Sequence, residues 1–304
     1  MALRSPVRIF MAAAAVAALV ALTVAACEKA TGQSRSAGSG ASAEPTDTSL
    51  GRGAGGTVSP RATTTGYPLP PANAGFDYQI GDPYPPAASV RVLTRDHDAT
   101  PVAGRYNICY VNGFQAQPEA AAWWRKTHPD LLLTRNGRTI VDSDWNEPLL
   151  DISTPTKRQA VADIVDGWTD QCATKGFQGL EVDNLDSWTR SQGALSQADA
   201  VAYATLLVGH AHAKGLAVGQ KNTVEIASVG RTRIGFDFAV AEECAEYQEC
   251  QGYVDAYGNR VLIIEYTRDH FRQACTRYGA TLSIVLRDRD VTAPGSRTYV
   301  YDSC

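Results

Sequence analysis

The sequence is poor in histidine and has no excess of basic residues. Only 5 of its 304 residues are His, the side chain that zinc sites and metal-dependent hydrolases use most often. Lys and Arg together number 28 against 32 Asp and Glu, which gives a formal net charge of −4. A nucleic-acid-binding protein usually carries a basic stripe, so we expect no nucleic-acid partner. A mildly acidic surface instead tolerates or attracts cationic partners.

Two common catalytic machineries are missing as well. No Ser stands on a nucleophile elbow, which argues against Ser-His-Asp catalysis. His210 and His212 are two residues apart in a predicted helix, so they face different ways and cannot chelate one metal ion. We therefore expect no cofactor and no metal site.

Long hydrophobic runs are absent except at the N-terminus. Hydrophobic residues make up 44% of the chain and charged residues 20%, a globular balance that excludes a disordered chain, a fibre and a multi-span membrane protein. Arg4 and Arg8 precede an apolar run over residues 9–26. This order is typical of a secretory signal peptide, which we assign to residues 1–26.

The end of this signal favours lipid attachment. The residues Val24-Ala25-Ala26-Cys27 are similar to the bacterial lipoprotein cleavage box, in which Cys27 would be lipidated. Plain cleavage after Ala26 and an uncleaved membrane anchor are the alternatives. All three place the rest of the chain outside the cytoplasm, on the extracellular face of a bacterial membrane or secreted.

Residues 27–74 are predicted to be a tether. Gly, Ser, Ala, Thr and Pro dominate this stretch, and Tyr67 is its only aromatic residue. Such a composition cannot bury enough apolar surface to fold. A flexible chain of this length reaches about 40 Å, enough to hold the remaining domain, residues 75–304, off a membrane.

That domain contains six cysteines, an even number that predicts disulfides in an exported protein. A zinc site is disfavoured because no His lies near Cys244 and Cys250. Those two form the first expected pair, because they close a short loop. Cys275 with Cys304 would fix the C-terminus, which leaves Cys109 with Cys172.

Eight strand-like apolar runs occur in the domain. They cover residues 76–80, 90–94, 107–111, 179–183, 216–220, 236–241, 261–266 and 282–286. Helical patterns lie between several of them, one over residues 157–175 after Pro155 and one from Ser196, which forms a capping box with Asp199. This alternation predicts a single (β/α)₈ TIM-type barrel. A doubly wound open sheet is the alternative, weakened because no Gly-rich phosphate loop follows a strand, and residues 149–152 could add a ninth strand.

Charged residues follow nearly every strand from the fourth onward. The fourth strand ends in Glu181-Val182-Asp183-Asn184-Leu185-Asp186 and the fifth in Gln220-Lys221-Asn222. The sixth ends in Glu242-Glu243-Cys244 and the seventh in Glu265-Tyr266. Barrel enzymes carry their chemistry at this end of the strands. Paired carboxylates there are the equipment of glycoside hydrolysis. Capping, calcium binding or plain solvation of strand ends would use the same residues.

Six segments in chain order carry a family resemblance. They are Ile108-Cys109-Tyr110 and residues 176–186, 215–222, 236–244, 247–250 and 261–266. These motifs resemble the family 114 glycoside hydrolases, barrel enzymes similar to endo-α-1,4-polygalactosaminidases, which cut α-1,4-linked galactosamine polymers. By that resemblance Asp183 and Glu242 match the catalytic pair. Ala241, where the family often has Asn, and the run at residues 111–115 depart from the family pattern and weaken the transfer of substrate.

The remaining strand-end residues are candidates for substrate binding. They are Glu181, Asn184, Asp186, Trp188, Tyr110, Lys221, Asn222, Glu243, Glu265 and Tyr266. Trp188 could stack on a sugar ring or pack in the core. We assign Asp183 as nucleophile and Glu242 as general acid/base, which implies retention of the α configuration.

Side-chain alternation conflicts with one of these assignments. If Leu180 and Val182 point out of the barrel, Glu181 and Asp183 point in. The same logic applied to Phe236, Phe238 and Val240 would place Glu243 inside rather than Glu242, unless the strand end bulges. We keep Glu242 as the acid and Glu243 as the reserve.

Two functions from different classes remain. The first is a surface-tethered, endo-acting glycoside hydrolase on a cationic amino-sugar polymer, whose ammonium groups would pair with the acidic rim. The second is a non-catalytic lipoprotein that binds such a polysaccharide on the same scaffold. We expect a monomer that touches the membrane only through its lipid anchor.

Overall fold

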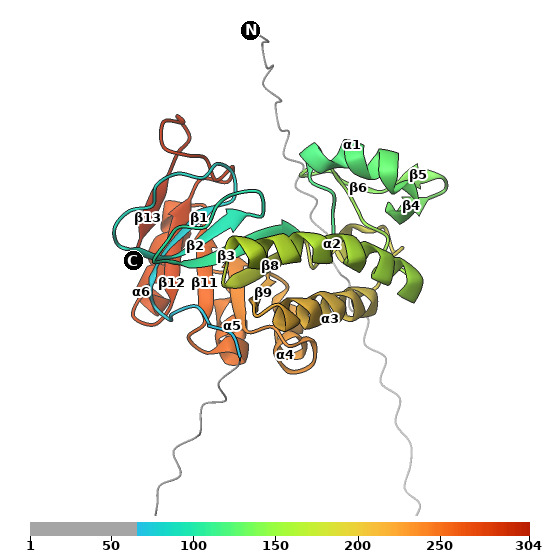
Figure 1. Cartoon of the computed structure of the whole chain (residues 1–304). Coiled ribbons are helices and arrows are strands. Elements are labelled where there is room, and N and C mark those ends of the chain that lie inside the picture. The colour runs from blue at the N-terminus through green and yellow to red at the C-terminus, as the bar shows by residue number, and fades with distance from the viewer. Residues whose placement is uncertain (1–65) are drawn as a thin grey trace, which may run out of the picture. The chain divides into compact units, whose positions relative to one another are not determined.

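The computed structural model of the protein describes residues 66–304 (Figure 1). Its centre is a sheet with eight consecutive parallel strands. They are β1 (Gly75–Gln79), β2 (Val90–Asp96), β3 (Tyr106–Asn112), β8 (Gly179–Asp183), β9 (Ala217–Lys221), β10 (Phe238–Glu242), β11 (Val261–Glu265) and β12 (Ser283–Arg287). Every boundary lies within two residues of the predicted one, and the TIM-type barrel is confirmed. The predicted signal peptide, Cys27 and the tether up to residue 65 lie outside the described residues.

The barrel is nearly closed, with its seam between β1 and β12. On the edge that faces the seam, β12 pairs with a short antiparallel strand, β13 (Tyr301–Ser303), which the sequence did not predict. An ion pair and a hydrogen bond join the two sides of the seam. The Arg287 guanidinium lies 3.2 Å from the Asp77 carboxylate, and the Ala74 N–H donates to Ser283 Oγ at 2.9 Å.

Helices cover the outside of the later strands. Thr154 caps α2 by accepting from the Lys157 N–H, and Ser196 and Asp199 form the predicted capping box of α3. The helices are α1 (Pro118–Thr127), α2 (Pro155–Lys175), α3 (Gln197–Ala213), α4 (Ala227–Val229), α5 (Cys250–Tyr257) and α6 (Arg268–Tyr278). Loops without a helix join β1 to β2 and β2 to β3, so the alternation of strand and helix is incomplete.

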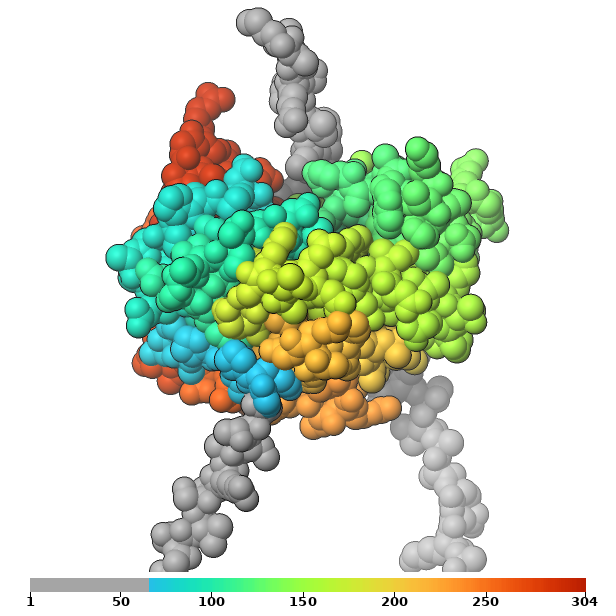
Figure 2. Space-filling model, in the orientation of Figure 1, coloured from blue at the N-terminus to red at the C-terminus, as the bar shows by residue number. Residues whose placement is uncertain are grey.

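A large insertion separates β3 from α2. It contains α1, a 3₁₀ turn at Pro129–Leu131, and two short hairpins, which lie together above α2 in Figures 1 and 2. The hairpins pair β4 (Thr134–Arg135) with β5 (Arg138–Thr139), and β6 (Val141–Asp142) with β7 (Glu147–Pro148). The possible ninth strand at residues 149–152 belongs to this insertion. Leu149 and Leu150 form only isolated bridges there, so they do not extend the barrel.

The core has two layers, and alternation along the strands divides them. Leu180 and Val182 pack outward with the helices, together with Val161 of α2. Phe76, Ile108 and the residues that share their orientation fill the barrel interior. Gly219 leaves room there for Phe238, because a Cβ at Gly219 would lie 2.5 Å from the Phe238 ring.

The described end of the predicted tether packs on the barrel. Tyr67 and Leu69 contact the interior cluster, and Ala74 joins them. The Tyr67 hydroxyl lies 2.9 Å from His212 Nε2 and donates to Asp237 Oδ1 at 3.2 Å. The packed domain therefore extends N-terminally past Gly75 to at least Tyr67. Composition averaged over the long stretch concealed this apolar end.

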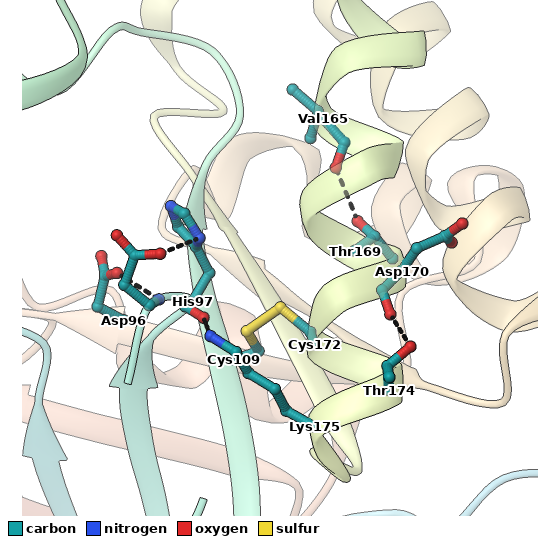
Figure 3. Close-up of a disulfide and its surroundings, with 10 residues drawn as sticks. Asp96, His97, Cys109, Val165, Thr169, Asp170, Cys172, Thr174 and Lys175 are labelled. Atoms are coloured by element: carbon teal, nitrogen blue, oxygen red, sulfur yellow. Dashed lines mark hydrogen bonds and ion pairs between the residues drawn. A yellow bond between two sulfur atoms is a disulfide. The ribbon is translucent and has the colours of Figure 1, made fainter. Parts of the chain in front are cut away.

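All three predicted disulfides are confirmed. They join Cys109 to Cys172, Cys244 to Cys250 and Cys275 to Cys304. Figure 3 shows the first of them, which attaches α2 to β3. Across residues 66–304, none of the helices combines the length and apolar character that a bilayer crossing requires.

Candidate active site

The carboxyl ends of the barrel strands surround a cavity of about 360 Å³. The β3–α2 insertion and the loops after β1 and β12 complete its walls. The lining is strongly acidic, with two arginines, Arg190 and Arg289. Its acidic residues are Asp142, Asp144, Glu147, Asp183, Asp186, Glu242 and Asp290. This is the end of the barrel at which such folds carry their chemistry.

Lys221 joins three carboxylates below the cavity. Its side chain is 2% exposed, and its Nζ lies 3.1 Å from Asp183 Oδ2, 3.2 Å from Glu242 Oε2 and 3.3 Å from Glu181 Oε1. Burial opposes the charged form, but the three carboxylates hold the pKa of Lys221 well above its usual value. The ammonium therefore stays charged and fixes the positions of the acidic groups.

Asp183 is held as a carboxylate. Its Oδ2 accepts from the Tyr110 hydroxyl at 2.8 Å as well as from Lys221, and its Oδ1 accepts from the Asn184 N–H at 2.6 Å. Although burial opposes ionisation, these donors and the Lys221 charge hold the pKa of Asp183 below its ordinary value. An ionised, fixed oxygen that faces the cavity is suited to nucleophilic attack.

Glu242 faces Asp183 across Lys221. Its Oε2 accepts from the Asn222 side-chain amide at 3.0 Å, and the Tyr266 hydroxyl donates to its Oε1. Both carboxylates contact the same Nζ, so their nearest oxygens are no farther apart than the sum of those two contacts, 6.3 Å. Two carboxyl groups this close can act on one bond.

The orientation of Glu242 corrects the sequence argument for β10. Phe238 and Val240 belong to the barrel interior, whereas Ala239 and Ala241 pack outward. Regular alternation then points Glu242 inward without a bulge. The argument was wrong because it placed every large apolar side chain outside, although the interior of a small barrel is apolar too. Glu243 follows with a left-handed φ of 56° and lines an adjoining hollow instead.

Glu181 lies beneath the cavity and does not line it. It is fully buried, and its Oε1 accepts from the Tyr78 hydroxyl at 2.7 Å. Burial raises the pKa of Glu181 to about 7, although the Lys221 ammonium opposes this. Glu181 contacts Lys221 and Tyr78 and therefore supports the site from below without facing the cavity.

The other predicted binding residues divide between the cavity and the core. Tyr110, Asn184, Asp186, Asn222 and Tyr266 line the cavity, as expected. Asp186 is also paired with Arg190 at 2.7 Å. Trp188 and Glu265 do not line it. Trp188 packs against the core, and Glu265 faces outward from β11, where its Oε1 accepts from the Ala245 N–H at 2.9 Å.

Sequence reasoning missed the part of the cavity that the insertion supplies. Asp142, Asp144, Trp145 and Glu147 all come from the β6–β7 hairpin. A Trp among three acidic residues was the available signal. It was overlooked because these residues do not follow a barrel strand.

Two groups of potential metal ligands occur among the described residues, and neither lies in the cavity. Cys244 and Cys250 with Glu265 form the first, but both sulfurs are committed to a disulfide. Asp96, His97 and Asp98 form the second, at the end of β2 and in the loop that follows it. Asp183 and Glu242 in the cavity are instead arranged around Lys221, which suits acid–base and nucleophilic chemistry.

Comparisons with known proteins give the family and support the fold. The model of glycoside-hydrolase family GH114 matches residues 57–304. The crystal structure of Aspergillus fumigatus Ega3 in complex with galactosamine is similar at 23% identity and a TM-score of 0.60, covering 78% of this chain and 99% of that one. The glycoside hydrolase domain of PelA from Pseudomonas aeruginosa aligns at 16% identity and a TM-score of 0.52, covering 73% and 97%. A search of curated proteins gives no match.

Proposed function

This chain belongs to glycoside hydrolase family GH114, and from that membership we propose that it cleaves α-1,4-linked galactosamine-containing polysaccharide by an endo-acting, retaining mechanism. The observation that carries the proposal is the pair Asp183 and Glu242, held on the buried Lys221 at the floor of an acidic cavity. The Ega3 structure, which is similar in fold, contains galactosamine.

The proposed reaction has two steps. In the first, an Asp183 oxygen attacks the anomeric carbon while protonated Glu242 gives its proton to the departing glycosidic oxygen. In the second, Glu242 takes a proton from water, the water oxygen bonds to the anomeric carbon, and the bond to Asp183 breaks. The nearest oxygens of the two carboxylates lie at most 6.3 Å apart, which supports a close pair. Carboxyl groups about 5–5.5 Å apart are typical of retaining enzymes, and groups about 6.5–9.5 Å apart are typical of inverting ones.

Two adjoining hollows support endo action. The second hollow contains Glu225, Glu243 and Glu249, and it shares Asp186, Asn222 and Glu242 with the main cavity. Glu242 therefore lies where the two hollows meet, with Asp183 in the main cavity, so a polymer could extend to both sides of the cleaved bond. Tyr247, 64% exposed, lines the second hollow and offers a face for sugar stacking.

We also propose that the protein acts outside the cytoplasm, as a monomer anchored through Cys27 or secreted. Three disulfides support an oxidising compartment. The apolar run and the small residues before Cys27 support export and lipidation.

Hydrolysis of a defined α-1,4-galactosamine oligomer by four proteins tests the proposal. We expect the wild type to cleave it and both Asp183→Asn and Glu242→Gln to lose at least about 10³-fold in kcat, while Glu243→Gln stays within about tenfold. A substrate whose leaving group needs no proton should partly rescue Glu242→Gln but not Asp183→Asn.

Mass spectrometry of the released products measures these rates, and circular dichroism checks folding. An inactive Glu243→Gln beside an active Glu242→Gln would move the acid to Glu243. Wild-type rates in all three variants would place the catalytic residues elsewhere in the protein. No cleavage by the wild type would instead favour a non-catalytic polysaccharide-binding protein.

A further inference from the structure

Glu147 is a buried carboxyl group in the wall of the cavity. It lies in β7 of the insertion and is only 8% exposed. Its Oε2 accepts from the Asn112 side-chain amide at 2.8 Å and from that of Asn184 at 3.4 Å. Asn184 directly follows Asp183, so Glu147 adjoins the catalytic carboxylate on the insertion side.

The hydrogen bonds around Glu147 suit an ionised carboxylate. The Asn112 Oδ1 accepts from the Gln115 N–H at 3.0 Å, which orients the amide nitrogen of Asn112 toward Glu147. Both asparagine amides therefore donate to Glu147. The Gln115 side-chain amide, in the orientation that satisfies its own polar atoms, donates to Glu147 Oε2 at 3.0 Å as well, and a carboxylate can only accept.

Glu147 differs from its buried neighbours because no cation accompanies it. Asp142 pairs with Arg190 at 2.7 Å, and Lys221 serves both Asp183 and Glu242. Among the described residues, no basic nitrogen lies within 4.0 Å of the Glu147 carboxylate. Asp144 and Asp290 are exposed, so water can solvate their charges.

The missing countercharge has an electrostatic consequence. Burial raises the pKa of Glu147 to about 7, although the Asn112 hydrogen bond opposes the rise. The negative charges of Asp183 and Asp142, and to a smaller extent that of Glu119, raise this pKa further. A cation placed beside Glu147 would relieve both effects, because it would replace lost hydration and balance the neighbouring charges.

We propose that Glu147 is the ammonium-binding residue of the cavity and that it selects a free amino sugar over its N-acetylated form. This inference rests on the proposed function for its ligand class. A protonated primary amine supplies the charge that Glu147 lacks and forms a charge-assisted hydrogen bond with it. An acetamido group brings no charge and leaves the buried carboxylate uncompensated.

Binding measurements separate this inference from the proposed catalysis. Glu242→Gln serves as the inactive background, because Asp183 carries a charge that acts directly on Glu147. Calorimetry compares a fully deacetylated α-1,4-galactosamine oligomer with its fully N-acetylated counterpart. We expect the background protein to prefer the amine form by at least about tenfold.

Three further substitutions in that background locate the preference. Glu147→Gln should bring the ratio of the two affinities close to one, and Glu147→Asp, which keeps the charge, should retain part of it. Asp144→Asn is the matched control, because Asp144 lies in the same hairpin and lines the same cavity but is exposed. It should leave the ratio within about threefold.

The inference is overturned if the background protein shows no preference, if Glu147→Gln keeps it, or if Asp144→Asn abolishes it equally. A purely structural role would lower both affinities together and leave their ratio unchanged. If Glu147→Gln fails to fold, Glu147→Ala and Glu147→Asp are measured in its place. An affinity ratio equal to that of the background protein in both variants would then overturn the inference. Hydrolysis by the wild type is scored separately: a Glu147-dependent preference without cleavage keeps the inference and contradicts the proposed function.

Discussion

Glu265 shows how a single buried carboxyl group can make stability depend on pH. It is fully buried behind β11, and its Oε2 has no hydrogen-bond partner among the described residues. Burial raises the pKa of Glu265 to about 7, although the Ala245 N–H opposes the rise. The folded state therefore binds this proton more tightly than the unfolded chain does. Its contribution to stability is complete at low pH and is lost as the pH rises toward 7.

Glu265→Gln should remove this pH dependence. Gln keeps an oxygen that accepts from the Ala245 N–H, but it has no charge to bury. Relative to wild type, the variant should gain on the order of 2–3 kcal/mol between pH 5 and pH 8. Urea unfolding of both proteins at the two pH values measures the difference. An equal difference at both pH values would contradict a raised pKa at this position.

The inward or outward orientation of a site residue was predictable where one face of its strand is apolar and the other is polar. On β8, outward Leu180 and Val182 left Glu181 and Asp183 facing inward, as expected. On β10 both faces are apolar, so hydrophobicity could not distinguish inside from outside. The family motif, rather than alternation, selected Glu242. For the same reason Glu265 was placed at the rim, although Tyr266 is the residue that lines the cavity.

At the scale of elements, the disulfides differ in what they hold. Cys109–Cys172 closes a separation of 63 residues between β3 and α2. Cys244–Cys250 closes only 6 residues, directly after the strand that carries Glu242. A longer loop costs more chain entropy to close, so the two bonds should affect stability and activity differently.

Paired Cys→Ala variants should separate these effects. Loss of Cys109–Cys172 should reduce the free energy of unfolding by about 4 kcal/mol, and loss of Cys244–Cys250 by about 2 kcal/mol. The second variant should nevertheless lose more hydrolytic activity, because Cys244 lies two residues after Glu242. Denaturation curves and oligomer hydrolysis measure the two quantities. Full activity without Cys244–Cys250 would show that this bond does not position Glu242.

The elements that the sequence did not reveal are short or depend on distant partners. The eight barrel strands carry runs of buried residues, and α2 and α3 carry recognisable caps, so both kinds were predictable. The hairpins of the insertion consist of two-residue strands, too short for a period to show. β13 is three partly buried residues long, and only its pairing with β12 defines it. The missed elements therefore include the wall that carries Glu147.

At the scale of the whole molecule, the N-terminal sequence predicts how the barrel is held. We expect Cys27→Ala to release the protein from the membrane or to block its maturation, because lipidation needs the Cys27 thiol. Membrane fractionation and mass measurement of the mature N-terminus follow both outcomes. A variant that remains as membrane-bound and as fully processed as wild type would contradict the anchor. Activity on soluble oligomers should not change, since the catalytic residues lie within residues 66–304.

The central claim is that Asp183 and Glu242 together carry out a double displacement on an α-1,4-galactosamine chain. Proton NMR of the first-formed products tests it most directly, because the anomeric configuration is read before mutarotation. With wild-type enzyme and a defined galactosamine oligomer, the account predicts that the α-anomer appears first, through an intermediate on Asp183. Initial release of the β-anomer would make water the nucleophile and would contradict the roles assigned to Asp183 and Glu242.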